Sequence, residues 1–254
     1  MYQPLILISN DDGVDAPGFR HLIEAVSDLG DIVAVAPTQH KSGQSSAITF
    51  SLPLRMYPYP SIGQAQTFAV DGTPVDCVKL AMHTIFRDRR PDLVLAGINH
   101  GSNAAVNSIY SGTMGAAFEG CMCGIPSIAY SLLSHDMNAD LSPTTDLIRE
   151  ITAKVLAHGL PQGVCLNVNF PASEKILGMK VLRAARGHWT DEYREYTDPF
   201  GRPFFMLTGR FENAEPEAED TDEYWLARDC ASVVPMRTDQ SALDCLDLVK
   251  DIMK

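Results

Sequence analysis

Apolar runs of strand length alternate with helix-like segments along most of this chain, and that alternation restricts the fold more than any other feature. The runs are almost continuously apolar, as strands are when both faces of a parallel sheet are covered. Helical segments between them supply the right-handed crossovers that parallel strands need. We therefore predict an α/β fold with a doubly wound, mostly parallel sheet. The expected strands are residues 5–9, 31–37, 91–99, 125–132 and 164–171, and the expected helices are residues 16–29, 74–86, 111–124 and 144–158.

The character of the chain changes near residue 186. Aromatic and polar residues alternate over residues 188–210 around a Pro-Phe-Gly-Arg-Pro turn, which predicts a β-hairpin. Residues 212–223 are acidic, and we interpret them as a solvated loop. A strand at residues 231–236 and an amphipathic closing helix at residues 241–254 complete the chain. We expect one domain over residues 1–254, with a core to about residue 185 and a hairpin, arm and closing helix from about residue 186.

Composition limits the possible partners. The 254 residues include 45% hydrophobic residues, enough for a large core, and carry a formal net charge of -12. Such a charge argues against a stable nucleic-acid partner, because nucleic-acid binding depends on clustered Lys and Arg. The first residues lack a basic segment, and their apolar run is too short for a signal peptide or a membrane span. We therefore expect no membrane partner and a cytoplasmic location.

The six cysteines are scattered without any CxxC pair or zinc-like spacing, and we expect them to be buried free thiols. Cys121 and Cys123 could instead form a metal or redox pair. Their apolar, small-residue surroundings favour a place in the core.

Two adjacent carboxylates, Asp11 and Asp12, come directly after the first strand, in Asn-Asp-Asp-Gly. Like charges this close raise a carboxyl pKa unless a cation or hydrogen-bond donors offset them. Gly13 lets the chain leave the strand, so that both side chains can reach one ion. Ser42 and Asn99 also follow expected strands, and such oxygen ligands suit one divalent ion, Mg²⁺ or Mn²⁺. Taken alone, Asn-Asp-Asp-Gly after a strand could equally be an ordinary turn, but its combination with Ser42 and Asn99 favours a site.

A second motif, Tyr110-Ser-Gly-Thr-Met-Gly115, introduces a helix. Hydroxyls and free backbone N–H groups at a helix start can bind an anion, although a simple helix cap explains Ser111-Gly-Thr113 as well. A divalent ion beside an anion site is what phosphate-ester hydrolysis requires. Residues 71–76 could bring two more carboxylates to the site, but a turn and helix cap is favoured there. His100 could protonate a leaving group, although the sequence shows no partner for it.

Five motifs in this order resemble the SurE (survival protein E) family of metal-dependent nucleotidases: ISNDDGVDAPG, VAPTQHKSGQSSAIT, DGTPVDCV, PDLVLAGINHGSN and YSGTMGAAFEG. The late segments TDPFGRPFFMLTG and ASVVPMRTD also resemble the family's pattern. The resemblance implies a Rossmann-like core and a C-terminal arm exchanged between subunits, giving a homodimer or homotetramer. It also implies removal of phosphate from nucleoside 5′- and 3′-monophosphates.

The resemblance places family roles on particular residues and shows three departures. Ala96 stands where the family usually has Ser, Ala105 replaces a usual Gly, and Cys230 lies where a Gly normally precedes a strand. None is a proposed ligand, so the departures affect the shape of the substrate loop more than the chemistry. The implied metal ligands are Asp11, Asp12, Ser42 and Asn99; the implied phosphate contacts are Asn10, Asn99, Ser111, Gly112 and Thr113; and the implied catalytic residues are Asp11, Asp12 and Asn99.

The main hypothesis is a phosphomonoesterase in which a metal-activated water attacks phosphorus. One rival is an aspartyl-phosphate-forming phosphatase with Asp11 as nucleophile, although Gly13 occupies the place where such enzymes have a second Asp. Another is a nucleotide-binding regulator without catalysis, because Rossmann-like folds support both functions. We expect the aromatic-rich residues 189–211 to form the assembly surface.

Overall fold

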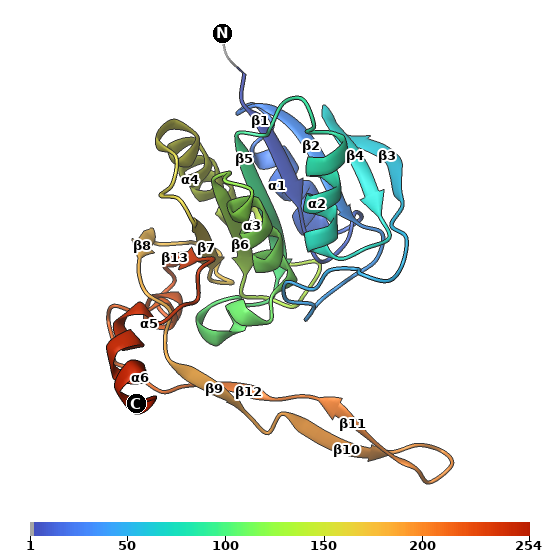
Figure 1. Ribbon diagram of the computed structural model, residues 1–254. Helices are drawn as coiled ribbons and strands as arrows, with labels where there is room; N and C mark the ends of the chain where they lie inside the picture. The colour runs from blue at the N-terminus through green and yellow to red at the C-terminus, as the bar shows by residue number, and fades with distance from the viewer. Residues whose placement is uncertain (1–2) are drawn as a thin grey trace.

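The computed structural model describes residues 3–254 and is built around one nine-stranded sheet (Figure 1). Only two neighbouring pairs are antiparallel, β3 with β4 at one side and β13 with β7 near the other. The remaining pairs are parallel, so the predicted α/β class with a mostly parallel sheet is confirmed. Across the sheet the strands are β3 (Met56–Ile62), β4 (Ala65–Val70), β2 (Asp31–Pro37), β1 (Leu5–Ser9), β5 (Leu93–His100), β6 (Ser127–Leu132), β7 (Val164–Phe170), β13 (Ala231–Arg237) and β8 (Met179–Val181).

Helices cover both faces of this sheet. Successive strand residues point to opposite faces, so Ile6 and Ile8 of β1 join one core cluster while Leu7 joins the other. The first cluster packs under α1 (Pro17–Ala25) and α4 (Thr145–His158). The second packs under α2 (Pro74–Thr84) and α3 (Gly112–Met122). No helix within residues 3–254 combines the length and the apolar character needed to cross a bilayer.

Element boundaries differ from expectation mainly at α1. This helix ends at Ala25 rather than Leu29, because residues 26–29 form turns in which the Leu29 N–H bonds to the Val26 carbonyl. β3 contains Pro58 and Pro60 and lies at the sheet edge, where their missing N–H donors are tolerated. α4 ends at His158 as predicted, and Gly159 follows it with a φ of +70°.

The order of strands creates a switch point between β1 and β5. From β1 the chain moves outward through β2 to the edge hairpin of β3 and β4, and it then returns to add β5 on the other side of β1. Ligands of open α/β sheets bind beyond the carboxyl ends of strands at such a point. The Asn-Asp-Asp-Gly turn follows β1 and Asn99 lies near the end of β5, so the turn and Asn99 both lie at this switch point.

The predicted hairpin is a long arm that projects away from the sheet (Figure 1). It consists of β9 (Gly187–Thr190) paired with β12 (Arg210–Asn213), and β10 (Tyr193–Thr197) paired with β11 (Pro203–Leu207). Every residue of β10 and β11 is exposed. An isolated two-stranded ribbon of this kind is marginally stable in water.

Three expectations for the C-terminal part and the cysteines require correction. The acidic stretch does not stay wholly in water, because Thr221 and Asp222 at its end are buried where α5 (Asp222–Leu226) begins. The closing segment forms a short 3₁₀ turn followed by α6 (Leu246–Ile252), and no residue of α6 is buried. Cys245 is exposed and Cys123 half-buried, whereas Cys77, Cys121, Cys165 and Cys230 are buried free thiols as predicted.

Glu223 provides a pH-dependent test of this packing. Burial, together with the charge of Asp222, raises the pKa of Glu223 to about 7. The folded carboxyl therefore keeps a proton that the unfolded chain has lost, and stability falls as pH rises from about 4.5 through 7. Glu223→Gln cannot ionise, and we expect it to raise Tm by about 2–4 °C at pH 8 with little change at pH 4.5, after allowance for partial solvent exposure.

Thermal unfolding by circular dichroism at both pH values measures this difference. Glu217→Gln is the matched control, because Glu217 lies in the same segment with an exposed side chain. An equal Tm change at both pH values would contradict the interpretation.

Candidate functional site

Asn10 closes the turn that follows β1. Its Nδ2 donates to the Gly13 carbonyl at 2.8 Å, and its Oδ1 accepts from the Gly13 N–H at 3.3 Å. Gly13 has a φ of +101°, a conformation that L side chains rarely adopt. Both polar atoms of the Asn10 side chain are therefore engaged in shaping the turn, and the turn directs Asp11 and Asp12 inward, where only 3% and 8% of their surface stays exposed.

Asp11 lies against the first residues of α3. The Thr113 N–H donates to its Oδ2 at 3.2 Å, and the Thr113 hydroxyl donates to its Oδ1. A Cβ added to Gly112 would lie 3.0 Å from the Asp11 Cβ, so glycine permits this close approach. Burial and the charge of Asp12 raise the pKa of Asp11 to about 6, against the lowering effect of the Thr113 hydrogen bonds. Positive charge placed beside this carboxylate would oppose the shift and favour its ionised form.

Asp12 has one oxygen held and one oxygen open. Its Oδ2 accepts from the His100 N–H at 3.1 Å, and the His100 Nδ1 lies 3.5 Å from the same atom. The His40 Nδ1 approaches Oδ1 to 3.2 Å without forming a hydrogen bond, and this buried oxygen has no hydrogen-bond partner. A buried, unpartnered carboxylate oxygen beside a second carboxylate is a feature that a bound cation would satisfy.

Asn99 supplies a further oxygen from the end of β5. The β5 to β6 register shifts between Ala96 and Asn99, and such an irregularity re-aims the side chains beyond it. The Asn99 Nδ2 donates to the Gly101 carbonyl at 2.8 Å. Within residues 3–254 its Oδ1 makes no hydrogen bond, so this oxygen is available to a ligand.

Ser42 lies on the rim of the site. Its neighbour Lys41 donates its backbone N–H to the Asp11 carbonyl at 2.7 Å, and Ser45 donates its N–H to the Tyr110 carbonyl at 3.0 Å. The loop is thus tied to both site motifs. The Ser42 side chain itself is exposed and makes no hydrogen bond to another described residue.

The Ser-Gly-Thr motif caps α3 with one hydroxyl. The Ser111 Oγ accepts the Met114 N–H at 3.0 Å, so the helix-cap interpretation is correct for that hydroxyl. The Thr113 hydroxyl goes to Asp11. The Ser111 and Gly112 N–H groups bond to no other described residue, and free N–H groups at a helix start are the donors that an anion would use.

Two features of the surroundings were missed or left open by the sequence. His40 was not singled out, although it follows β2 at the same edge of the sheet and thus obeys the strand-end rule. His100 does have a partner, Asp12, from a strand distant in the sequence. The favoured interpretation of residues 71–76 is confirmed, because Thr73 and Asp76 form a capping box at the start of α2.

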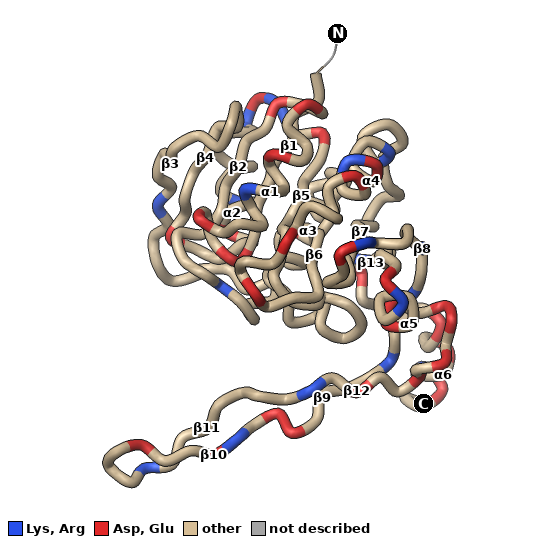
Figure 2. Tube along the Cα trace, turned by 180° about the vertical axis from the view of Figure 1, so that it is seen from behind, with Lys and Arg blue, Asp and Glu red and all other residues tan. Residues whose placement is uncertain are grey.

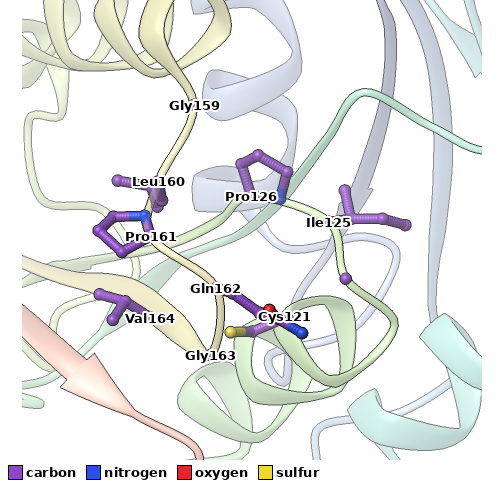
Figure 3. Close-up of a pocket in the computed structure, with 10 residues that line it drawn as sticks. Cys121, Ile125, Pro126, Gly159, Leu160, Pro161, Gln162, Gly163 and Val164 are labelled. Atoms are coloured by element: carbon purple, nitrogen blue, oxygen red, sulfur yellow. The ribbon is translucent and has the colours of Figure 1, made fainter.

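Two cavities lie at opposite edges of the sheet. One of about 570 Å³ adjoins the loop that carries Ser42, between Lys41, Ile48, Arg55 and the turn at Gly72. The other, of about 260 Å³, lies near the amino ends of β6 and β7, and Cys121 is its only titratable side chain (Figure 3). Among the described residues, no group of three or more His, Cys, Asp or Glu side chains could hold a metal. A metal site would therefore need the mixed carboxylate, amide and hydroxyl set.

Comparison with known proteins identifies the family. The family model described as Survival protein SurE matches residues 6–191. The chain belongs to the SurE family. A relative from Phocaeicola vulgatus named 5'-nucleotidase SurE is 46% identical over 249 residues, which cover 98% of this chain and 96% of the relative. A second relative with that name, from Christiangramia forsetii, is 47% identical over 244 residues and covers 94% of this chain and 93% of its own.

A solved structure supports the same assignment. The crystal structure of the SurE protein from Aquifex aeolicus superposes with a TM-score of 0.85 at 36% identity. The superposition covers 99% of this chain and 100% of the Aquifex chain. The resemblance read from the five motifs is confirmed, and the arm lies within the superposed length.

Thr113 tests the packing of the buried carboxylate. Thr113→Val keeps the shape of the side chain but removes the hydroxyl that donates to Asp11. Because a buried carboxylate then loses a donor, we expect the free energy of unfolding at pH 7 to fall by about 1–3 kcal/mol. Urea unfolding followed by fluorescence measures the change. Thr84→Val is the control, since the Thr84 hydroxyl bonds only within an exposed helix turn; an equal loss in both variants would contradict the role given to Thr113.

Proposed function

We propose that this SurE-family chain is a 5'-nucleotidase, a phosphomonoesterase that hydrolyses nucleoside 5′- and 3′-monophosphates to nucleoside and phosphate. The observation that carries the proposal is the buried pair Asp11 and Asp12, with one open oxygen, beside the free N–H groups that begin α3. The names of the relatives support the nucleotide substrate. The 3′-monophosphates come from the family resemblance of the motifs.

One divalent ion per subunit, Mg²⁺ or Mn²⁺, fits the residues present. Asp11, Asp12 and Asn99 offer oxygens, and Ser42 on the rim would complete the set by turning inward. Hard oxygen ligands of this kind suit such ions. When bound, the ion would polarise the phosphoryl oxygen, activate a water and neutralise the two carboxylates.

The protein groups around this position have distinct tasks. The N–H groups of Ser111 and Gly112 would bind phosphate oxygens, and Thr113 orients Asp11. The side chain of His100 is only 1% exposed and lies against Asp12. That burial favours a role in orienting Asp12 over protonation of a leaving group. Asn10, both of whose polar side-chain atoms bond to Gly13, would contribute by shaping the turn.

The two rival functions are less well supported. Phosphatases that use an aspartate nucleophile carry a second Asp two residues later, and Gly13 occupies that place after Asp11. Trapping of a phospho-aspartate during turnover would revive that mechanism. Tight nucleotide binding with no phosphate release in any divalent metal would favour a non-catalytic regulator.

Asp11 provides the direct test of the metal site. We expect the purified protein to release phosphate from nucleoside monophosphates with Mg²⁺ or Mn²⁺ and to lose this activity in EDTA. Asp11→Asn should lower kcat by about 10²–10³-fold, because it removes a charge that holds the ion near the reacting phosphate. Asp31→Asn is the matched control at an exposed aspartate on the opposite edge of the sheet. Metal-dependent turnover by Asp11→Asn at the wild-type rate would reject the assignment.

We further propose a homodimer or homotetramer in which the arm is the contact surface. Tyr193, Phe204 and Phe205 of β10 and β11 are 68%, 42% and 62% exposed, and burying such side chains against a second copy is favourable. Light scattering of the wild type should give a multiple of the 27.8 kDa chain mass. The double variant Phe204→Ser and Phe205→Ser should shift the mass toward one chain.

Phe50→Ser is the control for this double variant, because it also replaces an exposed aromatic side chain by serine. Phe50 is 93% exposed in the loop after the site and lies far from the arm in sequence. It should leave the mass unchanged. A wild type that runs as one chain at every concentration would contradict the proposed assembly.

The distribution of charge bears on the class of partner, and the free cysteines bear on the cellular compartment. Lys and Arg are spread over the core and the arm and alternate with acidic residues, without gathering on one element (Figure 2). This pattern supports a small nucleotide substrate over a stable nucleic-acid partner. Six free cysteines support a reducing compartment, and we propose the cytoplasm.

A further inference from the structure

The loop between β5 and α3 joins the two halves of the candidate site. It leaves β5 just after His100, passes through the 3₁₀ turn η1 (Ala105–Ile109) and reaches Ser111 at the start of α3. Ile109 and Tyr110 are 60% and 58% exposed, directly before the free N–H groups of the helix start. These two are the exposed large side chains that directly precede the proposed phosphate position in the chain.

A carboxylate from the C-terminal segment holds the middle of this loop. Asp222 is completely buried, and its Oδ2 accepts the Ala105 N–H at 2.8 Å. Its Oδ1 accepts the N–H groups of Ala185 and Glu223, each at 2.8 Å. Both oxygens are thus used to connect the loop with the chain at the base of the arm and with α5. A carboxylate that is fully buried and accepts hydrogen bonds from three N–H groups has a structural role and is not a solvated charge.

Ala105 needs this support. Its φ is +51°, in the left-handed region that is unfavourable for a residue with a Cβ. Residues on either side are held by other elements, because Asn103 donates its N–H to the Asn169 Oδ1 at 2.9 Å and Asn107 accepts from the Trp189 Nε1 at 2.9 Å. Asp222 supplies the hydrogen bond at the strained residue between them.

The end of the loop between β5 and α3 is hydrogen-bonded to the loop that carries Ser42. The Ser45 hydroxyl donates to the Ile109 carbonyl at 2.7 Å, and the Ser45 N–H donates to the Tyr110 carbonyl at 3.0 Å. Neither contact uses the side chains of Ile109 and Tyr110, which stay free to meet a ligand. The loop is therefore fixed through its backbone and presents an apolar and an aromatic side chain outward.

We propose that Asp222 is a positioning residue for nucleoside recognition: it fixes the backbone of the loop at Ala105 so that Ile109 and Tyr110 form the contact surface for the sugar and base. Aromatic rings bind nucleobases by stacking, and apolar side chains exclude water from them. This inference rests on the proposed nucleotidase function. It assigns Asp222 no contact with phosphate or metal.

The test compares two substrates in the metal-loaded full-length protein. Asp222→Asn keeps the size of the side chain but converts one acceptor oxygen into a donor. We expect kcat/KM for a nucleoside monophosphate to fall about tenfold, mostly through KM, while kcat/KM for p-nitrophenyl phosphate, which lacks a nucleoside, changes less than about twofold. Asp220→Asn is the matched control, because Asp220 lies in the same segment, is exposed and pairs with Arg183 outside the loop.

A second change separates positioning from general damage. Adding Ala105→Gly to Asp222→Asn removes the strain at the positive φ and should restore most of the nucleotide KM. If Asp222→Asn does not fold, Ala105→Val, which disfavours the same φ from within the loop, must show the same loss for the nucleotide alone. Amide exchange of the wild type gives a readout independent of activity, in which the Ala105 N–H should be strongly protected.

Three results would overturn the inference. These are equal behaviour of Asp222→Asn and Asp220→Asn, an equal loss for both substrates, and an unprotected Ala105 amide in the wild type. A wild type that releases no phosphate from any nucleotide would instead reject the proposed function, and with it the nucleoside role, while amide exchange would still report on the Asp222 contact.

Discussion

The repulsion between Asp11 and Asp12 is the constraint on which the rest of the site depends. Two neighbouring carboxylates have been taken out of water, and only part of their charge is offset by hydrogen bonds from Thr113 and His100. A burial of this kind is unfavourable unless the surrounding groups are fixed in place. The Asn10 turn, the close approach of Gly112 and the start of α3 all serve to hold these two side chains at one position.

The sheet provides the rigidity that this arrangement needs. β1 and β5 are central strands, covered by helices on both faces, and the site forms where their carboxyl ends meet. Gly18 of α1 shows how tight the packing is, since a Cβ there would lie 2.1 Å from the Ile98 carbonyl oxygen of β5. A site at the ends of packed strands is held more accurately than one on free loops.

The sequence predicted the parts of this molecule that depend on local pattern. Apolar runs located the strands, and the strand-end rule brought Asp11, Asp12 and Asn99 to one edge of the sheet. Sequence pattern could not show contacts between segments that are far apart in the chain. His100 had no visible partner because Asp12 is 88 residues away, and Asp222 resembled a solvated acid because its partner Ala105 is 117 residues away. A positive φ at Ala105 is likewise invisible in the letters.

The order in which the parts of the site occur along the chain bears on synthesis. The last of the proposed metal and phosphate residues is Thr113, the second residue of α3. Asp222 and β13 come more than a hundred residues later. β7 keeps an open edge until β13 pairs with it. As the chain leaves the ribosome, amino-terminal parts fold first. The carboxylate pair would therefore form early, while the loop beside it would gain its final shape only after the arm has been made and the chain has returned to the sheet.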